Sequence, residues 1–287
     1  TNSANILGTV QLNATGAEKS ITFENNDSTF RALEVFAEDQ ITLGTNLTTT
    51  VGSLTIDADY AGDDNANDKV TVSDGVILTA KDDLILEDAV GNYDAEGALT
   101  LSAGDDLIVR GNLTTVGDLT VDADNDGLAG GLFQIATGKT VSIGGATTSI
   151  TSRTIDLGGV INAGSGSIDF LVSNDGSTTL GADITLGAVG VNTADYRIDN
   201  PEFSNIFAGD VQIGDSTSGT IRVNNVAKFR TDDISGMLTL DATGDGEQII
   251  FYEGFAEFNS LTAKADDAII VNRNILTDRG DLILEGD

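Results

Sequence analysis

An internal repeat is the feature that most constrains the fold of this chain. Residues 33–59 (LEVFAEDQITLGTNLTTTVGSLTIDAD) align with residues 99–124 (LTLSAGDDLIVRGNLTTVGDLTVDAD) at an offset of 66 that falls to 65 after Thr50. A third, weaker copy covers residues 261–287. Self-similarity of this kind indicates units that stack along one axis and bury a continuous core. We therefore expect residues 1–287 to form one elongated segment, part of a longer repeat protein.

A shorter period lies inside these blocks. Alanine follows a short apolar strand at five positions, spaced 21, 22, 23 and 20 residues apart: Ala37, Ala58, Ala80, Ala103 and Ala123. Between them, runs of Val, Ile, Leu and Thr alternate with Gly, Asp and Asn, the composition of short strands joined by tight turns. The pattern predicts an all-β parallel β-helix, or β-solenoid, with coils of about 20–23 residues. The expected strand cores are 54–56, 70–72, 84–86, 107–109, 119–121, 141–143, 211–213 and 268–271.

The turns repeat as well. Pairs of aspartates lie at 82–83, 105–106 and 266–267, each between a recurring alanine and an apolar strand. Aspartate accepts local backbone hydrogen bonds and tolerates turn geometry, so a structural role for these pairs outweighs a catalytic one. Three glycines also recur at one position, where we expect either a positive φ or a close approach of the backbone. They are Gly52, Gly117 and Gly280.

Charge and composition exclude several classes of function. The chain has 14 Lys and Arg residues against 46 Asp and Glu residues, and the net charge of −32 repels nucleic acids and anionic membrane surfaces. Cys and His are absent, which removes disulfides, thiolate catalysis and the commonest general base. No apolar stretch approaches the ~20 residues that cross a bilayer, so we expect no membrane insertion. The lack of Cys is compatible with export, and we expect an extracellular or cell-surface location.

An enzyme that acts on polysaccharides is one alternative, because parallel β-helices include pectate lyases and polygalacturonases. Sites of that kind need a carboxylate cluster beside Arg, Lys or His that meets the acidic sugar. This chain has no His, and its few basic residues are scattered. We therefore expect no enzymatic activity and assign no catalytic or cofactor-binding residue.

The most specific local motif is DADNDG at residues 122–127, which has the form D-x-D-x-D-G. Its carboxylates have the spacing of calcium loops, so Asp122, Asp124 and Asp126 are candidate Ca²⁺ ligands. The twelfth position of an EF-hand loop is Phe133 here in place of Glu, and a turn with solvated carboxylates is the competing interpretation. A second, looser acidic loop comprises Asp57, Asp59, Asp63 and Asp64.

The repeat is hard to follow from about residue 189 to residue 258. The single proline, Pro201, lies here, and aromatic residues gather. We expect either diverged coils whose wider core the aromatic rings fill, or a contact region. In the second case the dense basic group Arg222, Lys228 and Arg230 would meet the carboxylates of the next subunit.

Three strings carry a family resemblance: GVILTAKDDLILED from Gly75, ALTLSAGDDLIV from Ala98 and GNLTTVGDLTVDAD from Gly111. With these strings the chain resembles the filamentous haemagglutinin-like large exoproteins, over roughly two thirds of its length. The resemblance implies a secreted, right-handed parallel β-helix that serves as an adhesin or a surface fibre. The expected handedness comes from this resemblance alone.

A solenoid leaves open strand edges and uncovered core at its terminal coils. We therefore expect the chain to form or extend a surface fibre by end-to-end stacking, either on copies of itself or on flanking repeats of the same chain. An adhesin that binds surface glycans or proteins is the alternative, and a polysaccharide lyase or hydrolase is less favoured. Filaments of the pure protein, glycan binding and release of sugar ends would distinguish the three.

Overall fold

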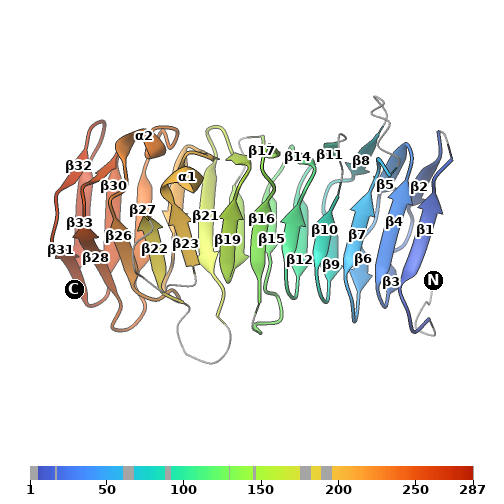
Figure 1. The fold of residues 1–287 in the computed structure, drawn as a ribbon, viewed down its shortest axis with the longest axis horizontal. Helices are drawn as coiled ribbons and strands as arrows, with labels where there is room; N and C mark the ends of the chain where they lie inside the picture. The colour runs from blue at the N-terminus through green and yellow to red at the C-terminus, as the bar shows by residue number, and fades with distance from the viewer. Residues whose placement is uncertain are drawn as a thin grey trace.

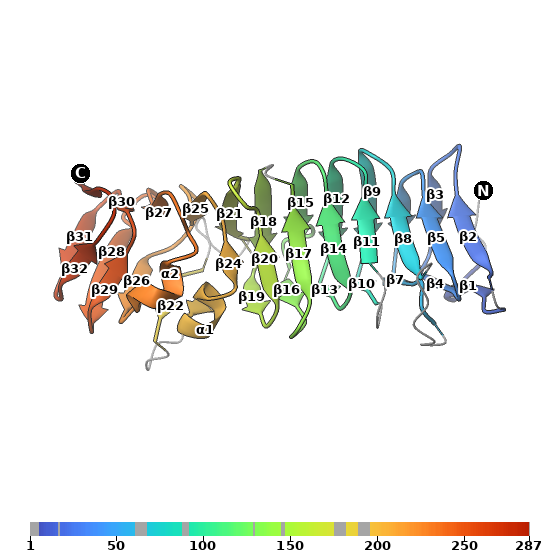
Figure 2. The ribbon, with the colours of Figure 1, turned by 90° about the horizontal axis from the view of Figure 1, so that it is seen from above.

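The computed structural model describes residues 6–16, 18–60, 68–87, 92–128, 130–144, 147–174, 182–188 and 196–286. Almost every element in these residues is a β-strand, and the strand pairs are parallel. The strands stack along one axis, and the two ends of the chain lie at opposite ends of the resulting rod (Figure 1 and Figure 2). The all-β prediction is confirmed, and the stacked parallel sheets are consistent with a β-solenoid.

Three long sheets contain most of the strands. Sheet I comprises β1 (Val10–Ala14), β4 (Leu33–Ala37), β7 (Leu54–Asp57), β10 (Leu84–Leu86), β13 (Leu107–Val109), β16 (Leu132–Ile135) and β19 (Thr154–Leu157). Sheet II comprises β2 (Ser20–Phe23), β5 (Gln40–Leu43), β8 (Lys69–Val72), β11 (Asn92–Ala95), β14 (Asn112–Thr115), β17 (Thr140–Ile143), β20 (Val160–Asn162) and β24 (Ile206–Phe207). Sheet III comprises β3 (Ser28–Phe30), β6 (Leu47–Thr49), β9 (Val76–Ala80), β12 (Leu99–Ala103), β15 (Leu119–Asp122), β18 (Thr148–Ser152), β21 (Ser167–Val172), β25 (Asp210–Ile213), β27 (Leu238–Ala242), β30 (Leu261–Ala265) and β33 (Leu282–Gly286).

Two shorter sheets and two short helices complete the C-terminal half. Sheet IV comprises, in spatial order, β23 (Tyr196–Asp199), β22 (Ile184–Gly187), β26 (Ile221–Asn224), β28 (Gln248–Glu253) and β31 (Ala268–Val271). Sheet V comprises β29 (Ala256–Phe258) and β32 (Ile275–Thr277). The helices are α1 (Asn200–Phe203) and α2 (Lys228–Thr231), which lie in contact with each other (Figure 2). Neither reaches the length of a membrane-spanning helix, and no other helix in the described residues does.

The order of the strands shows how the chain winds. Neighbours in sheet I are three strands apart in the chain, so the chain passes through sheets I, II and III in turn and then returns to sheet I. Like residues meet across the ladder: Leu33 pairs with Leu54. The step between paired residues varies along the rod. Leu99 and Leu119 lie 20 residues apart, whereas Leu47 and Leu78 lie 31 apart.

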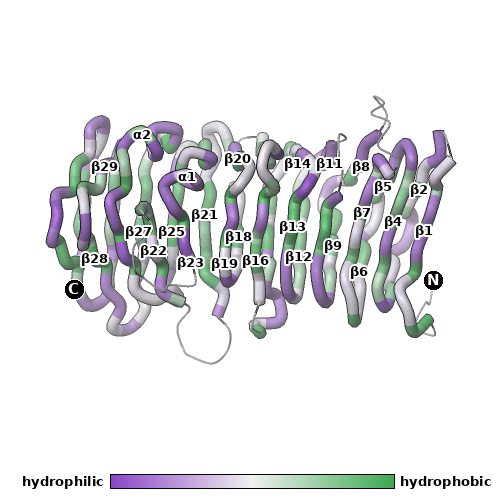
Figure 3. The backbone as a smooth tube through the Cα atoms, in the orientation of Figure 1, coloured by the Kyte–Doolittle hydropathy of each residue, from purple (hydrophilic) through white to green (hydrophobic). Residues whose placement is uncertain are grey.

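Alternation along each strand places the core inside the rod. In β4 the burial alternates, and Leu33, Val35 and Ala37 have no solvent exposure. Figure 3 shows the same alternation of apolar and polar residues on strand after strand. Because successive side chains of a strand point to opposite faces, one apolar face per strand is enough to build this continuous core.

All eight strand cores expected from the sequence lie within strands, namely β7, β8, β10, β13, β15, β17, β25 and β31. The recurring alanines, however, form two stacks. Ala37 and Ala58 belong to sheet I, at the end of β4 and just past β7, whereas Ala80, Ala103 and Ala123 lie at the corresponding ends of sheet III strands. The repeat block 33–59 therefore begins on a different face from the blocks at 99–124 and 261–287, both of which begin in sheet III.

The regular order of strands changes at β22 (Ile184–Gly187), just before the diverged region. Strand β22 precedes β23 in the chain but lies beyond it in sheet IV, between β23 and β26. Aromatic side chains fill the interior here, since Tyr196, Phe203, Phe251 and Phe258 are fully buried. Phe229 and Phe255 remain largely exposed, so only part of the aromatic group serves the core. Residues 189–195, the first part of this region, lie outside the described residues.

Candidate functional site

The C-terminal coil ends in strands that pair on one side only. In the described residues β31, β32 and β33 are the last members of sheets IV, V and III. Val271, Leu282 and Leu284 pair with Phe251, Leu261 and Ala263, which point into the core one coil earlier. The earlier residues are buried, but Val271 is 49% exposed, Leu282 41% and Leu284 43%. This end of the rod thus presents inward-facing apolar side chains together with open strand edges. We call it the C-terminal end face.

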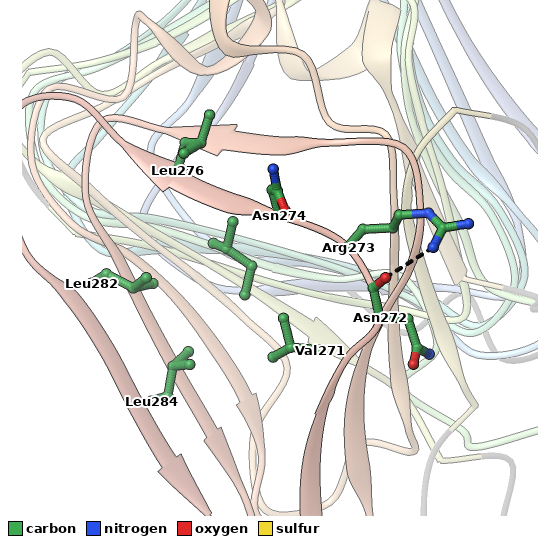
Figure 4. Close-up of a pocket in the computed structure, with 8 residues that line it drawn as sticks. Val271, Asn272, Arg273, Asn274, Leu276, Leu282 and Leu284 are labelled. Carbon is green, nitrogen blue, oxygen red and sulfur yellow. Dashed lines mark hydrogen bonds between the residues drawn. The ribbon is translucent and has the colours of Figure 1, made fainter.

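A hollow in this end face has a volume of about 430 Å³. Its lining residues, drawn in Figure 4, are Val271, Asn272, Arg273, Asn274, Ile275, Leu276, Leu282 and Leu284. Apolar side chains come from the strands, and the polar ones come from the turn between β31 and β32. Within that turn Arg273 Nη1 donates to the Asn272 carbonyl at 3.0 Å (Figure 4). An apolar floor with a polar rim is the usual anatomy of a protein contact surface.

The opposite end of the rod shows a related but milder feature. Strands β1, β2 and β3 are the first members of sheets I, II and III. Val10, Leu12, Ile21 and Phe30 pack against the core yet are only partly buried. The first coil therefore also has an uncovered side.

The D-x-D-x-D-G loop does not gather its three carboxylates. Asp122 accepts a hydrogen bond from the backbone N–H of Asp124 at 3.2 Å, as in an Asx-turn. Asp124 Oδ2 accepts from Ser173 Oγ at 2.6 Å, and burial raises the pKa of this carboxyl. Asp126 forms an ion pair with Lys81, which lowers its pKa. Calcium binding by Asp122, Asp124 and Asp126 stays a prediction, and it would require these side chains to leave their present partners.

Asp63 and Asp64 of the looser loop lie outside the described residues.

A different trio of acids does converge. Among the described residues, Asp82, Asp83 and Asp105 offer carboxylate oxygens that all lie within 4.8 Å of one another. Burial raises the pKa of Asp83, and the like charges of Asp82, Asp106 and Asp105 add to this against a lowering backbone hydrogen bond from Asp106. Carboxylate oxygens are the ligands that Ca²⁺ prefers. The trio could not be predicted from the sequence, because it forms only when turns from successive coils stack.

The aspartate pairs have the turn role that the sequence predicted. Asp83 Oδ1 accepts from the backbone N–H of Asp106 at 3.3 Å, and Asp106 Oδ1 accepts from that of Leu132 at 3.1 Å. Each carboxylate therefore satisfies a backbone donor in the turn of the next coil. Asp266 makes the equivalent bond backwards along the rod, to the N–H of Gly246 at 2.8 Å.

The basic group of the diverged region is engaged within the chain. Arg222 forms an ion pair with Asp183, and Lys228 forms one with Asp278 at 2.6 Å. Arg230 donates to Ser204 Oγ at 2.9 Å and lies over the ring of Phe229. These contacts join neighbouring coils of one chain. A contact of the three residues with another subunit stays a prediction.

Comparisons of this chain with protein-family models, with curated proteins and with solved structures found no match. The resemblance to filamentous haemagglutinin-like exoproteins therefore stays a prediction.

Proposed function

We propose that this chain is a segment of an extracellular structural repeat protein that forms or extends a fibre by end-to-end stacking of β-coils. In this proposal the rod is a right-handed parallel β-helix whose basic coil has about 20–23 residues, and longer coils contain loop insertions. The steps of 21 residues from Leu33 to its partner Leu54 and of 20 residues from Leu99 to its partner Leu119 support this length. The resemblance to filamentous haemagglutinin-like exoproteins predicts the same secreted rod. We propose no catalytic role.

One observation carries the proposal. The inward residues of β33 are about two fifths exposed, while their partners Leu261 and Ala263 are buried. Covering such side chains contributes roughly 25 cal/mol for each Å² of apolar surface removed from water. The open edges of β31, β32 and β33 offer a row of backbone donors and acceptors that a further parallel coil would satisfy. Because the contact joins two different ends, it propagates without closing.

Electron microscopy and analytical ultracentrifugation of the purified chain, with and without Ca²⁺, test the proposal. We expect rods several times the length of one chain, with a mass that rises with protein concentration. A monodisperse monomer under both conditions would remove the claim of stacking between copies. Binding of the monomer to a glycan array would instead favour the adhesin alternative.

A further inference from the structure

Sheet III runs the length of the rod and, in the described residues, has one free edge at each end. Its eleven strands begin with β3 and end with β33. Every pair of neighbours in this sheet is parallel, so its two edge strands have the same direction. A second copy placed beyond β33 can therefore add its own β3 as the next parallel strand of the same sheet.

The pairings along sheet III fix the register of such an addition. We call a row of residues that pair from strand to strand a column. The column that ends in Leu284 begins with Ser28, and the column two residues further along ends in Gly286 and begins with Phe30. Between its ends the Leu284 column consists of Leu47, Leu78, Leu101, Val121, Ile150, Phe170, Ile213, Leu240 and Ala263.

The first coil departs from both columns in the size of its residues. The Leu284 column is apolar between its ends, yet it begins with the small, polar Ser28. The Gly286 column has small, buried residues, yet it begins with Phe30, which packs against the core and is only partly buried. The paired members of the Gly286 column between its ends are Thr49, Ala80, Ala103, Ser152, Val172, Ala242 and Ala265.

The last coil is complementary to the first. In the continued register, Ser28 of a second copy lies over Leu284 and its Phe30 lies over Gly286. The space over Gly286 is open, since a Cβ there would meet nothing nearer than the Ile269 backbone nitrogen at 3.7 Å. Neighbouring strands lie about 4.8 Å apart, so an aromatic ring on the added strand reaches this space. At both positions a large residue faces a small one, which is how protein interiors fill their volume.

We infer that β33 accepts β3 of a second copy in this register, and that the ring of Phe30 in the space over Gly286 selects the first coil as the partner. The inference rests on the end-to-end stacking proposed above, and it names the strand and the register that the stacking uses. Coils with threonine, alanine or valine in place of Phe30 would leave a void over Gly286, and voids in a packed interior are destabilising.

Cysteine pairs on the outer face test the register, because the chain has no native Cys. In the continued register Thr29 of one copy pairs with Glu285 of the other, and both are exposed. Within one chain these residues lie at opposite ends of the rod, so a disulfide between them must join two copies (Figure 1). We expect oxidised Thr29→Cys/Glu285→Cys to form a ladder of linked chains, at a yield about tenfold above that of Thr29→Cys/Ile283→Cys, which is two residues out of register.

Substitutions at Gly286 and Phe30 test the contact itself. Gly286 lacks a positive φ and has room for a side chain, so Gly286→Leu should leave the melting temperature of the dispersed chain unchanged. It should shorten filaments by roughly fivefold or more, because the new side chain fills the space that Phe30 needs. The double variant Phe30→Ala/Gly286→Leu should recover filament length, since a large residue again faces a small one.

The outcomes separate this inference from the proposed function. Equal ladders from the two cysteine variants would overturn the register. Filaments of Gly286→Leu as long as those of the parent chain, or no recovery in the double variant, would overturn the role of Phe30. In each of these cases the filaments of the parent chain would still support end-to-end stacking. A parent chain that forms no filaments removes both the stacking and the register.

Discussion

Asp74 occupies the space that a side chain at Gly97 would need. Its Oδ1 accepts the backbone N–H of Ala98 at 2.7 Å, and a Cβ built on Gly97 would lie 2.0 Å from that oxygen. The carboxylate of one coil thus rests on the bare backbone of the next. The same relationship recurs further along the rod, where Cβ atoms at Gly236 and Gly280 would meet Asp210 Oδ1 at 2.3 Å and Ser260 Oγ at 1.9 Å.

Gly97→Ala should therefore destabilise the rod by about 1–3 kcal/mol, because the new methyl group must displace Asp74 and its hydrogen bond to Ala98. The loss of stability is measured as a lower melting temperature in circular dichroism. Gly8→Ala is the matched control, since nothing lies within 4 Å of a Cβ there, and it should leave the melting temperature unchanged. An equal effect of the two substitutions would show that the stacking of Asp74 on Gly97 contributes little.

The stability of the rod should fall as the pH rises from 5 to 8, in part through Glu202. Burial raises the pKa of Glu202 to about 7 from its ordinary value of 4.5, and the nearby Asp199 and Asp156 add to this against hydrogen bonds from the backbone of Asp199 and Leu157. The folded state therefore holds the proton more tightly than the unfolded state. The stabilisation that the folded state gains from protonated Glu202 is fully present below pH 4.5 and is lost as the pH rises through 7.

Glu202→Gln isolates this contribution, because the amide stays neutral at every pH. The protonation of Glu202 is linked to roughly 2–3 kcal/mol of stability between pH 5 and pH 8. The drop in melting temperature over this range should therefore shrink by on the order of 5 °C or more in the variant, since about 1 kcal/mol shifts the Tm of chains of this size by roughly 2–4 °C. Glu253→Gln, at an exposed position, is the control for the general loss of one negative charge. Identical pH profiles for both variants would remove Glu202 as a source of the slope.

Asp82→Asn should stabilise the protein by on the order of 0.5 kcal/mol at low ionic strength, because it relieves the repulsion among Asp82, Asp83 and Asp105. The gain should vanish in about 1 M salt, where the screening length is only about 3 Å. Urea melts at both salt concentrations measure it. Asp245→Asn removes an exposed charge outside this trio and should gain less. A gain that survives high salt would point to a cause other than charge repulsion.

Local patterns in the sequence predict the strands of this rod well, because each strand buries one apolar face regardless of its neighbours. They predict the turns equally well. For the recurring glycines the sequence left two explanations, a positive φ or a close approach of the backbone. Because Gly52, Gly117 and Gly280 all lack a positive φ, close approach explains their recurrence. Which strands pair across coils is harder to predict from these local patterns. The alignment of residues 33–59 with 99–124 matches strand to strand but ignores the face on which each strand lies, so the recurring alanines of the sequence come from two different stacks.

The position of β22 and the meeting of Asp82 with Asp105 were also beyond sequence reasoning. Both depend on which segments become neighbours after winding. The partners of Asp122, Asp124 and Asp126 could not be predicted from the sequence for the same reason. The spacing of these acids suits a cation, but Lys81 and Ser173, which come from other coils, engage two of the three carboxylates.

Adjacent residues of β33 provide the sharpest test of the C-terminal end face. Leu284 points inward, in register with Ala263, whereas Ile283 pairs with Thr262 and points outward. Leu284→Asp places a charge where a stacked coil would have to bury it, at a cost of several kcal/mol, and should shorten or abolish filaments. Ile283→Asp adds the same charge one residue away on the outer surface and should leave filament length unchanged. Sedimentation of both variants beside the parent chain measures the difference in filament length. Equal loss of filaments in both variants would mean that added negative charge, and not burial at the end face, controls assembly.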